Sequence, residues 1–212
     1  MIEVFAGFFL GIIASFFVWY VNYHWVIPSV KFSSDISRRQ LSNNHSFYQV
    51  AFKNTGRRKI LDIDVLVRIG VKGYKNAEGW GYHAIRTNAS KVPYLSPEQE
   101  NRRLVRIFDT RKEIEFVDLP SESISKGIKG CPTLEDVLKL GEDASVQVHI
   151  FGYDSFSGTR RHFVSKNYKR GDIRFGRLED LAIMPEKNLE VYRSSQLSQP
   201  PADPLPPPPS AA

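Results

Sequence analysis

An uncharged apolar stretch from Val4 to Val21 constrains this chain more than any other feature of its sequence. Its eighteen residues rise by about 27 Å as an α-helix, close to the ~30 Å hydrocarbon core of a bilayer. Aromatic residues gather at its end, namely Trp19, Tyr20, Tyr23 and Trp25. Amphipathic rings favour a membrane–water interface, whereas a cleaved signal peptide needs positive charge before the stretch and small residues after it. The sequence therefore predicts one retained N-terminal transmembrane helix, within an anchor of residues 1–27, over a signal peptide or a buried soluble helix.

The charges that flank this stretch predict its orientation. The only charged side chain before it is Glu3, while Lys31, Arg38 and Arg39 follow within about 20 residues. Positive charge close to a membrane helix biases that flank toward the cytoplasm. The single Cys131 agrees, because an exported domain of this size more often has paired cysteines. We expect a single-pass protein with its C-terminal part in the cytoplasm, beneath the inner membrane if the cell is bacterial.

Residues 28–195 are long enough for one domain with a proper core, and this domain is basic. Without Glu3 and Asp203, 21 of the 23 acidic residues oppose 29 basic ones, a balance of about +8. Such a domain, tethered to a membrane, is attracted to anionic lipid headgroups. No helix-turn-helix, zinc-finger or RNA-binding pattern indicates nucleic acid. We predict lipid contact by Lys31, Arg38 and Arg39, with an ordinary solvated surface as the alternative.

A second basic cluster, Arg57-Arg58-Lys59, falls in a predicted turn at one end of the domain. The sequence leaves open whether that end faces the membrane.

Alternating apolar residues predict that this domain is mainly β. In Leu61–Val71 every odd position is apolar, which places one face of a strand on a core. The other predicted strands are Phe47–Lys53, Leu104–Phe108, Glu113–Val117, Val146–Tyr153, Arg160–Ser165 and Leu189–Tyr192. One short helix is expected at Leu134–Leu140, between a capping Thr133 and Gly141. Many short strands separated by turns indicate an immunoglobulin-like β-sandwich.

Residues 196–212 form a proline-rich tail with seven of the 13 prolines. Such a segment buries no core, and we expect a disordered, partly polyproline II extension. Pro201-Ala202-Asp203-Pro204 fits PxxP, so a docking site for a partner is the alternative reading.

Three blocks in order resemble the cytoplasmic domain of inward-rectifier potassium channels. They are VKFSSDISRRQLSNNHSFYQVAFKNTGRRKILDIDVLVRI, TLEDVLKLGEDASVQVHIFGYDSFSG and TRRHFVSKNYKRGDIRFGRLEDL. The third has Tyr168, then Asp172-Ile173, then Phe175-Gly176-Arg177, similar to a run in that family. The resemblance implies an immunoglobulin-like sandwich, which in the channels assembles as a four-fold ring beneath the membrane.

The chain also departs from that family, because it has one predicted membrane helix and no selectivity filter. Gly79-Trp80-Gly81-Tyr82 is superficially filter-like, but it has no hydrophobic pore helix before it, and we expect a loop or turn there. Selectivity through carbonyl rings needs a filter at membrane depth. Inherited potassium selectivity therefore has no residues to support it.

Motifs for chemistry are missing from the sequence. The five histidines show no metal-ligand spacing, and there is no P-loop, dinucleotide-binding glycine motif or nucleophile elbow. Asp154-Ser155-Phe156-Ser157-Gly158 has the composition of a hairpin turn. We expect no enzyme, cofactor or metal, although catalytic carboxylate pairs that meet only in space leave no such pattern.

Small residues recur every four positions in the apolar stretch, at Gly7, Gly11 and Ser15. This spacing lets two membrane helices approach closely, so we predict a homo-oligomer. The function that fits best is a membrane-anchored cytoplasmic binding or scaffolding module that oligomerises and senses a lipid or ligand. An accessory subunit or small non-selective component of a transport assembly is the alternative. It is less favoured, because a water-filled pore needs a polar helix face and Ser15 is the only polar side chain here.

Overall fold

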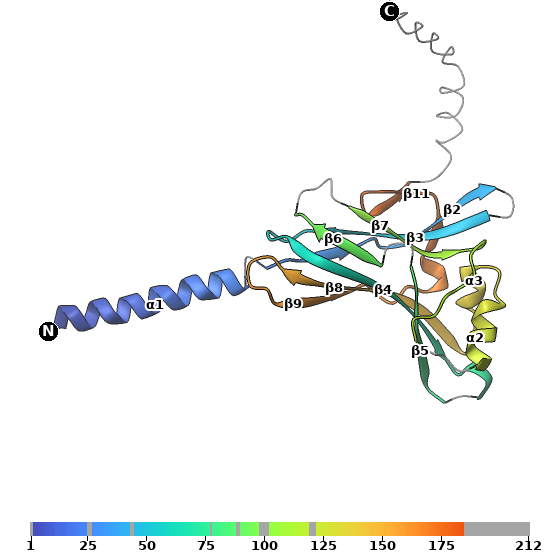
Figure 1. Cartoon of the computed structure of the whole chain (residues 1–212), viewed down its shortest axis with the longest axis horizontal. Coiled ribbons are helices and arrows are strands. Elements are labelled where there is room, and N and C mark those ends of the chain that lie inside the picture. Colours follow the sequence, from blue (N-terminus) through green and yellow to red (C-terminus); the bar gives the residue numbers. More distant parts are fainter. Residues whose placement is uncertain are drawn as a thin grey trace, which may run out of the picture.

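A computed structural model describes residues 2–24, 27–42, 45–76, 78–87, 90–97, 102–118 and 122–184. Helix α1 (Ile2–His24) projects from one end of a body made mainly of β-strands (Figure 1). The predicted strand Leu189–Tyr192 and the tail 196–212 lie outside the described residues. The mainly-β prediction is confirmed.

Two five-stranded sheets make up the body. In the first sheet, β3 lies at the centre and pairs antiparallel with β1, β2 and β7, while β10 pairs parallel with β2. Its strands are β1 (Val30–Phe32), β2 (Ile36–Ser42), β3 (His45–Asn54), β7 (Arg103–Asp109) and β10 (Ile173–Phe175).

In the second sheet, β4 is central and pairs antiparallel with β5, β6 and β8, and β8 pairs with β9. Its strands are β4 (Ile60–Lys72), β5 (Trp80–Ile85), β6 (Lys91–Leu95), β8 (Asp143–Asp154) and β9 (Arg160–Val164).

Smaller elements complete the described fold. They are the hairpin of β11 (Arg177–Glu179) and β12 (Ala182–Met184), the helices α2 (Glu122–Lys129) and α3 (Leu134–Val137), and the 3₁₀ turns η1 (Tyr74–Asn76) and η2 (Arg170–Asp172).

The core lies between the two sheets, where side chains of β3 and β7 meet those of β4 and β8. The alternation predicted for β4 is confirmed from Ile63 to Val71, whose odd positions are buried. It fails at Leu61, which is 41% exposed. Asp62 has φ of +46°, and the pairing with β8 shifts register between Leu61 and Asp64. An irregularity of this kind moves the preceding side chain to the other face, so Ile60 is buried instead.

Two other local predictions are wrong. Glu113–Val117 is not a strand, because only an isolated bridge from Phe116 to Ile85 forms there. Gly79-Trp80-Gly81-Tyr82 is not a loop, because Trp80 begins β5, and Tyr82 pairs with Gly70. An added Cβ at Gly70 would lie 2.9 Å from the Tyr82 ring, so the glycine makes room for this aromatic side chain.

The predicted helix is shorter than expected but begins as predicted. Helix α3 covers Leu134–Val137, and the Thr133 hydroxyl accepts a hydrogen bond from the Asp136 N–H. After it, Gly141 has φ of +64°, a conformation that favours glycine. The cap and the terminating glycine were therefore readable from the sequence, whereas the helix length was not.

Candidate membrane-facing site

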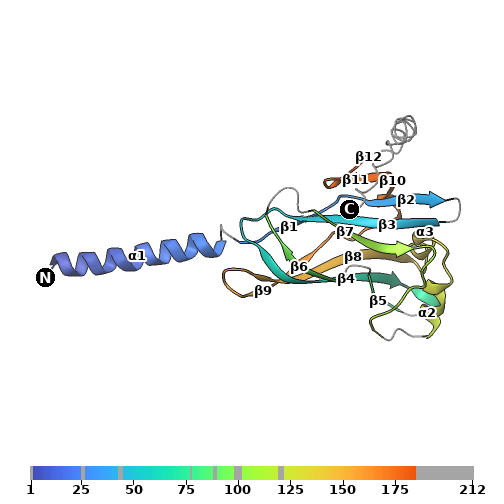
Figure 2. The same ribbon diagram turned by 45° about the horizontal axis from the view of Figure 1, so that its top comes forward.

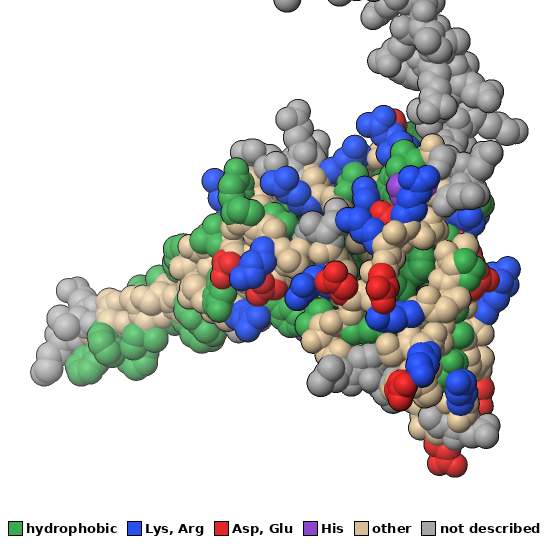
Figure 3. Space-filling model, turned by 45° about the vertical axis from the view of Figure 1, so that its right-hand side comes forward, with side chains coloured by type: hydrophobic (Ala, Val, Ile, Leu, Met, Phe, Trp, Pro, Cys, Tyr) green, Lys and Arg blue, Asp and Glu red, His purple; other side chains and the backbone are tan. Residues whose placement is uncertain are grey.

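Helix α1 stands clear of the sheets (Figure 1). Its described large apolar side chains are exposed. Phe5, Phe9, Leu10, Phe16 and Phe17 are each at least 60% exposed. Figure 3 shows green apolar side chains along the helix, whereas blue basic and red acidic side chains are interspersed over the body. An apolar surface this continuous marks a segment that contacts a partner or a lipid phase.

Measured over the described residues, no helix combines the length and the apolarity needed to cross a membrane.

The small residues predicted for self-association share one face of α1. Gly7, Gly11 and Ser15 line a shallow groove with Phe8, Ile12, Phe16 and Trp19 beside them. An added Cβ at Gly7 or Gly11 would have nothing within 4 Å. The structure thus places the three residues together and leaves the space over the two glycines open.

The turn after β3 packs on the chain that leaves α1. The N–H groups of Thr55 and Gly56 donate to the Ser29 carbonyl oxygen at 2.7 and 3.2 Å. An added Cβ at Gly56 would lie 2.4 Å from the Ser29 nitrogen, so only glycine permits this approach. The basic turn Arg57–Lys59 therefore lies at the end of the body from which α1 emerges.

The β8–β9 hairpin turn lies beside the same end, as both views show (Figures 1 and 2). The Ser155 N–H donates to the Lys59 carbonyl oxygen at 3.1 Å, and Arg58 Nη1 lies 3.3 Å from Asp154 Oδ2. The Arg58 guanidinium also lies 4.2 Å from the centre of the Phe156 ring. We call Arg57, Arg58, Lys59 and Phe156 the α1-proximal rim.

Asp154 holds this hairpin turn in shape. Its side chain is 1% exposed and accepts hydrogen bonds from the Phe156 N–H at 3.1 Å and the Ser157 hydroxyl at 2.8 Å. Burial alone would raise the pKa of the Asp154 carboxyl, but these bonds and Arg58 outweigh it and hold the pKa below its ordinary value. Asp154 is therefore a charged structural residue with its bonding capacity used internally.

The sequence pattern did not single out Phe156. It is 73% exposed, more than any other large hydrophobic side chain of the described residues. The available signal was one large aromatic residue in a hairpin turn whose other residues are polar or glycine.

The three predicted lipid-contact residues do not lie together. Lys31 pairs with Lys53 close to the α1 end of β3, whereas Arg38 pairs with Tyr48 and Arg39 with Phe47. Tyr48 lies six positions before Asn54, the α1 end of β3, which is about 20 Å of strand. Chain length would have allowed all three to stay near the helix, but β2 carries the two arginines toward the far end of the body (Figure 1).

Arg38 is engaged there in an internal cluster. Its Nη1 lies 2.7 Å from Glu135 Oε1, and the Tyr48 hydroxyl donates to the other oxygen of that carboxylate. The Arg38 guanidinium also lies over the Phe175 ring at 4.7 Å. These contacts attach α3 to the first sheet, and the neighbouring Arg39 lies over the Phe47 ring at 5.6 Å.

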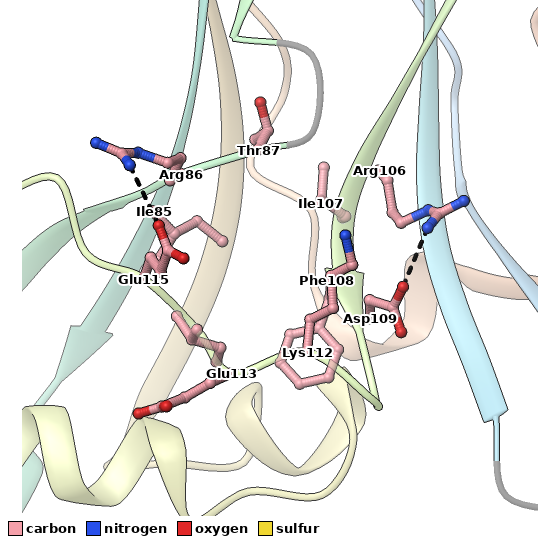
Figure 4. A pocket seen from close by; sticks show the side chains of 11 residues that line it. Ile85, Arg86, Thr87, Arg106, Ile107, Phe108, Asp109, Lys112, Glu113 and Glu115 are labelled. Carbon is pink, nitrogen blue, oxygen red and sulfur yellow. Dashed lines mark hydrogen bonds and ion pairs between the residues drawn. The ribbon is translucent and has the colours of Figure 1, made fainter.

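A crevice opens between β5 and β7, with a cavity volume of about 160 Å³ (Figure 4). Four of its charged groups form two ion pairs, Arg86 with Glu115 at 3.3 Å and Arg106 with Asp109 at 3.1 Å. Small-molecule pockets usually measure about 300–1,000 Å³. We therefore assign no organic ligand to this crevice.

Histidines meet on the outer face of the second sheet. His149 Nδ1 lies 3.0 Å from His162 Nε2, and Phe151 stacks on His162 with centroids 4.3 Å apart. Within the described ranges, no three His, Cys, Asp or Glu side chains are grouped so as to hold a metal ion.

Two histidines with lowered pKa predict that the stability of the protein depends on pH. Burial, His162 and Arg68 lower the pKa of His149, and burial lowers the pKa of His83 against an opposing effect of Asp118. The unfolded chain binds these protons at the ordinary pKa of about 6.5, before the folded chain does. The free energy of unfolding should therefore fall as the pH drops below about 7.

Urea denaturation of the detergent-solubilised chain at about pH 7.5 and about pH 5.5 measures this change. Replacing both residues, His83→Gln with His149→Gln, should flatten the dependence. Equal stability of the unsubstituted chain at the two pH values would contradict the prediction. Carboxylates with lowered pKa do not interfere, because they begin to lose their contribution only below about pH 5.

Comparison with known proteins adds little. No family model matches the chain, and no curated protein matches it. Among solved structures it is similar to Spo0M, a sporulation control protein from Bacillus subtilis, with 12% identity and a TM-score of 0.31. The match covers 70% of this chain and 49% of Spo0M, so the chain matches about half of that protein. A likeness this weak carries no argument about function, and the resemblance to inward-rectifier channels stays a prediction.

Proposed function

We propose that this protein is a single-pass, membrane-anchored binding or scaffolding module whose β-rich body faces the cytoplasm. The observation that supports it best is α1, a 23-residue helix that leaves the body and exposes its apolar side chains. Two residues of the uncharged stretch, Val4 and Ala6, have side chains that are not among those the structure describes. Exposed rings near the end of the helix, Trp19 and Tyr20, suit a membrane–water interface.

The charges around the exit of α1 support the cytoplasmic orientation. Exposed Lys31, Arg57 and Lys59 lie on or beside the segment that packs against Ser29, just after the helix. Basic residues next to a membrane helix favour the cytoplasmic side. An immunoglobulin-like sandwich of the inward-rectifier type remains the proposed fold family, and without a filter the proposal includes no potassium selectivity.

Membrane extraction and thiol labelling test the anchor and its orientation. The full chain should stay in the membrane fraction at alkaline pH, and a chain without residues 2–24 should be released. In intact cells, an impermeant maleimide should not reach a cysteine placed at Tyr94, which is 49% exposed. Release of the full chain, or labelling of Tyr94→Cys before lysis, would overturn the proposal.

Self-association through the groove of α1 gives a separate prediction. Gly11→Ile places a branched side chain where nothing now lies within 4 Å of an added Cβ, and should block close approach of a second helix. We expect about tenfold weaker association, or about 1.4 kcal/mol, in a membrane two-hybrid assay of the helix. Phe9→Ile is the control, because Phe9 lies on the opposite side of the helix and does not line the groove. An unchanged signal for Gly11→Ile would leave α1 as an anchor only.

A further inference from the structure

We propose that the α1-proximal rim binds anionic lipid headgroups, with Phe156 entering the interface between headgroups and acyl chains. This inference rests on the proposed membrane anchor and names the partner at the anchored end of the body. It differs from the sequence prediction, because two of the three residues predicted for lipid contact, Arg38 and Arg39, lie toward the far end.

Position is the first argument. Ser29 follows the last residue of α1, His24, by five residues and accepts hydrogen bonds from the turn that leads into Arg57. The β8–β9 hairpin turn is attached to this basic turn, because the Ser155 N–H donates a hydrogen bond to the Lys59 carbonyl oxygen. A membrane that holds α1 therefore lies close to both turns, whereas the β2–β3 hairpin points the opposite way (Figures 1 and 2).

Charge is the second argument. The residues 27–31, 55–59 and 154–160 contain five basic side chains and a single carboxylate, that of Asp154. One of the five, Arg160, pairs with Asp64 of β4 at 3.8 Å. Asp154 is 1% exposed and engaged by Arg58, so it does not offset the exposed Arg57 and Lys59 at the surface. A positive surface next to the membrane is attracted to anionic lipid within about one Debye length, roughly 8 Å at physiological salt.

The aromatic side chain is the third argument, because charge alone would not require it. Phe156 is 73% exposed at the tip of a hairpin turn that Asp154 bonds hold in shape. Its ring lies 4.2 Å from Arg58, an arrangement that presents an apolar ring beside cations. Phenylalanine next to lysine and arginine is a combination found in segments that lie in the bilayer interface.

A matched pair exists away from the rim. Phe175 is 57% exposed and lies 4.7 Å from the Arg38 guanidinium, so it repeats the arginine–phenylalanine contact on β10. Position relative to α1 is the difference between the two pairs. If the inference is right, only the Phe156 pair responds to the membrane.

The experiment uses the full chain in bilayer nanodiscs with Cys131→Ser, so that an environment-sensitive dye attaches only at Ser155→Cys. The dye should shift to shorter wavelength as phosphatidylserine is added to phosphatidylcholine, and the shift should reverse at high salt. Arg57→Glu with Lys59→Glu should weaken the apparent lipid affinity roughly thirtyfold, and Phe156→Ser should reduce the shift. Two controls accompany these variants. Lys112→Glu with Arg177→Glu should leave the apparent lipid affinity unchanged. A dye at Arg174→Cys, next to Phe175, should not shift when phosphatidylserine is added.

Each outcome decides something. A chain that stays in nanodiscs without any dye response to anionic lipid overturns the rim and leaves the anchor intact. Failure of the chain to enter bilayers overturns the proposed function itself. A shift produced in neutral bilayers by inorganic phosphate alone overturns the lipid assignment in favour of a soluble anion. An equal shift of the dye at Arg174→Cys would show that basic surface anywhere on the body responds to anionic lipid. That result would also overturn the assignment to the rim.

Discussion

Replacement of Gly141 by alanine should destabilise the body by about 2–5 kcal/mol. Gly141 has φ of +64°, where an L side chain costs about 1–2 kcal/mol. An added Cβ would also lie 2.1 Å from the carbonyl oxygen of Lys72, a backbone atom of the central strand β4. Relieving that overlap must move the strand end, which adds about 1–3 kcal/mol. Urea denaturation of the detergent-solubilised chain, followed by circular dichroism, measures the loss.

Gly158 is a matched control for this change. It has the same φ of +64°, but an added Cβ there would have nothing within 4 Å. Gly158→Ala should therefore show only the backbone cost of about 1–2 kcal/mol. The difference between the two variants isolates the contact with Lys72, and equal losses would show that the close approach has no energetic consequence.

Removal of the Glu135 carboxylate should destabilise the body by about 2 kcal/mol. Glu135 binds Arg38 and the Tyr48 hydroxyl, and Glu135→Ala leaves both groups without this partner. The side chains of Arg38 and Glu135 are 23% and 17% exposed, so solvent compensates less than it does at the surface. Burial and the bond to Glu135 also raise the pKa of Tyr48, which keeps its hydroxyl protonated and able to donate.

Two further variants separate charge from shape. Glu135→Gln keeps the volume and one acceptor oxygen for Arg38, and its NH2 group can donate to the Tyr48 hydroxyl in place of accepting from it. It should lose about half as much stability, because these bonds are no longer charge-assisted. Glu115→Ala removes an ion pair with Arg86 whose side chains are 66% and 68% exposed, and should change stability by less than about 0.5 kcal/mol. If Glu115→Ala lowers the free energy of unfolding as much as Glu135→Ala does, the cluster at α3 stabilises the fold no more than a surface ion pair.

The local sequence pattern was enough to predict the longest elements of the fold. Alternation over Leu61–Val71 predicted the central strand β4, and eighteen uncharged residues predicted helix α1. Thr133 and Gly141 marked the ends of the α3 region, because capping and left-handed turns depend on neighbouring backbone atoms. Strands of three residues, such as β1 and β10, were missed since so short a segment shows no period.

The sequence by itself determined that the chain has an apolar N-terminal helix, a basic and mainly β body, and a cluster of arginine and lysine at residues 57–59. Only the tertiary structure decided which of its basic residues gather at the exit of α1. The reason is physical, because strand pairing converts sequence distance into direction. Arg38 lies 14 residues after His24 and is carried away along β2. Arg57 lies 33 residues after His24 and is brought back by β3, so the rim with Phe156 forms from segments about 100 residues apart.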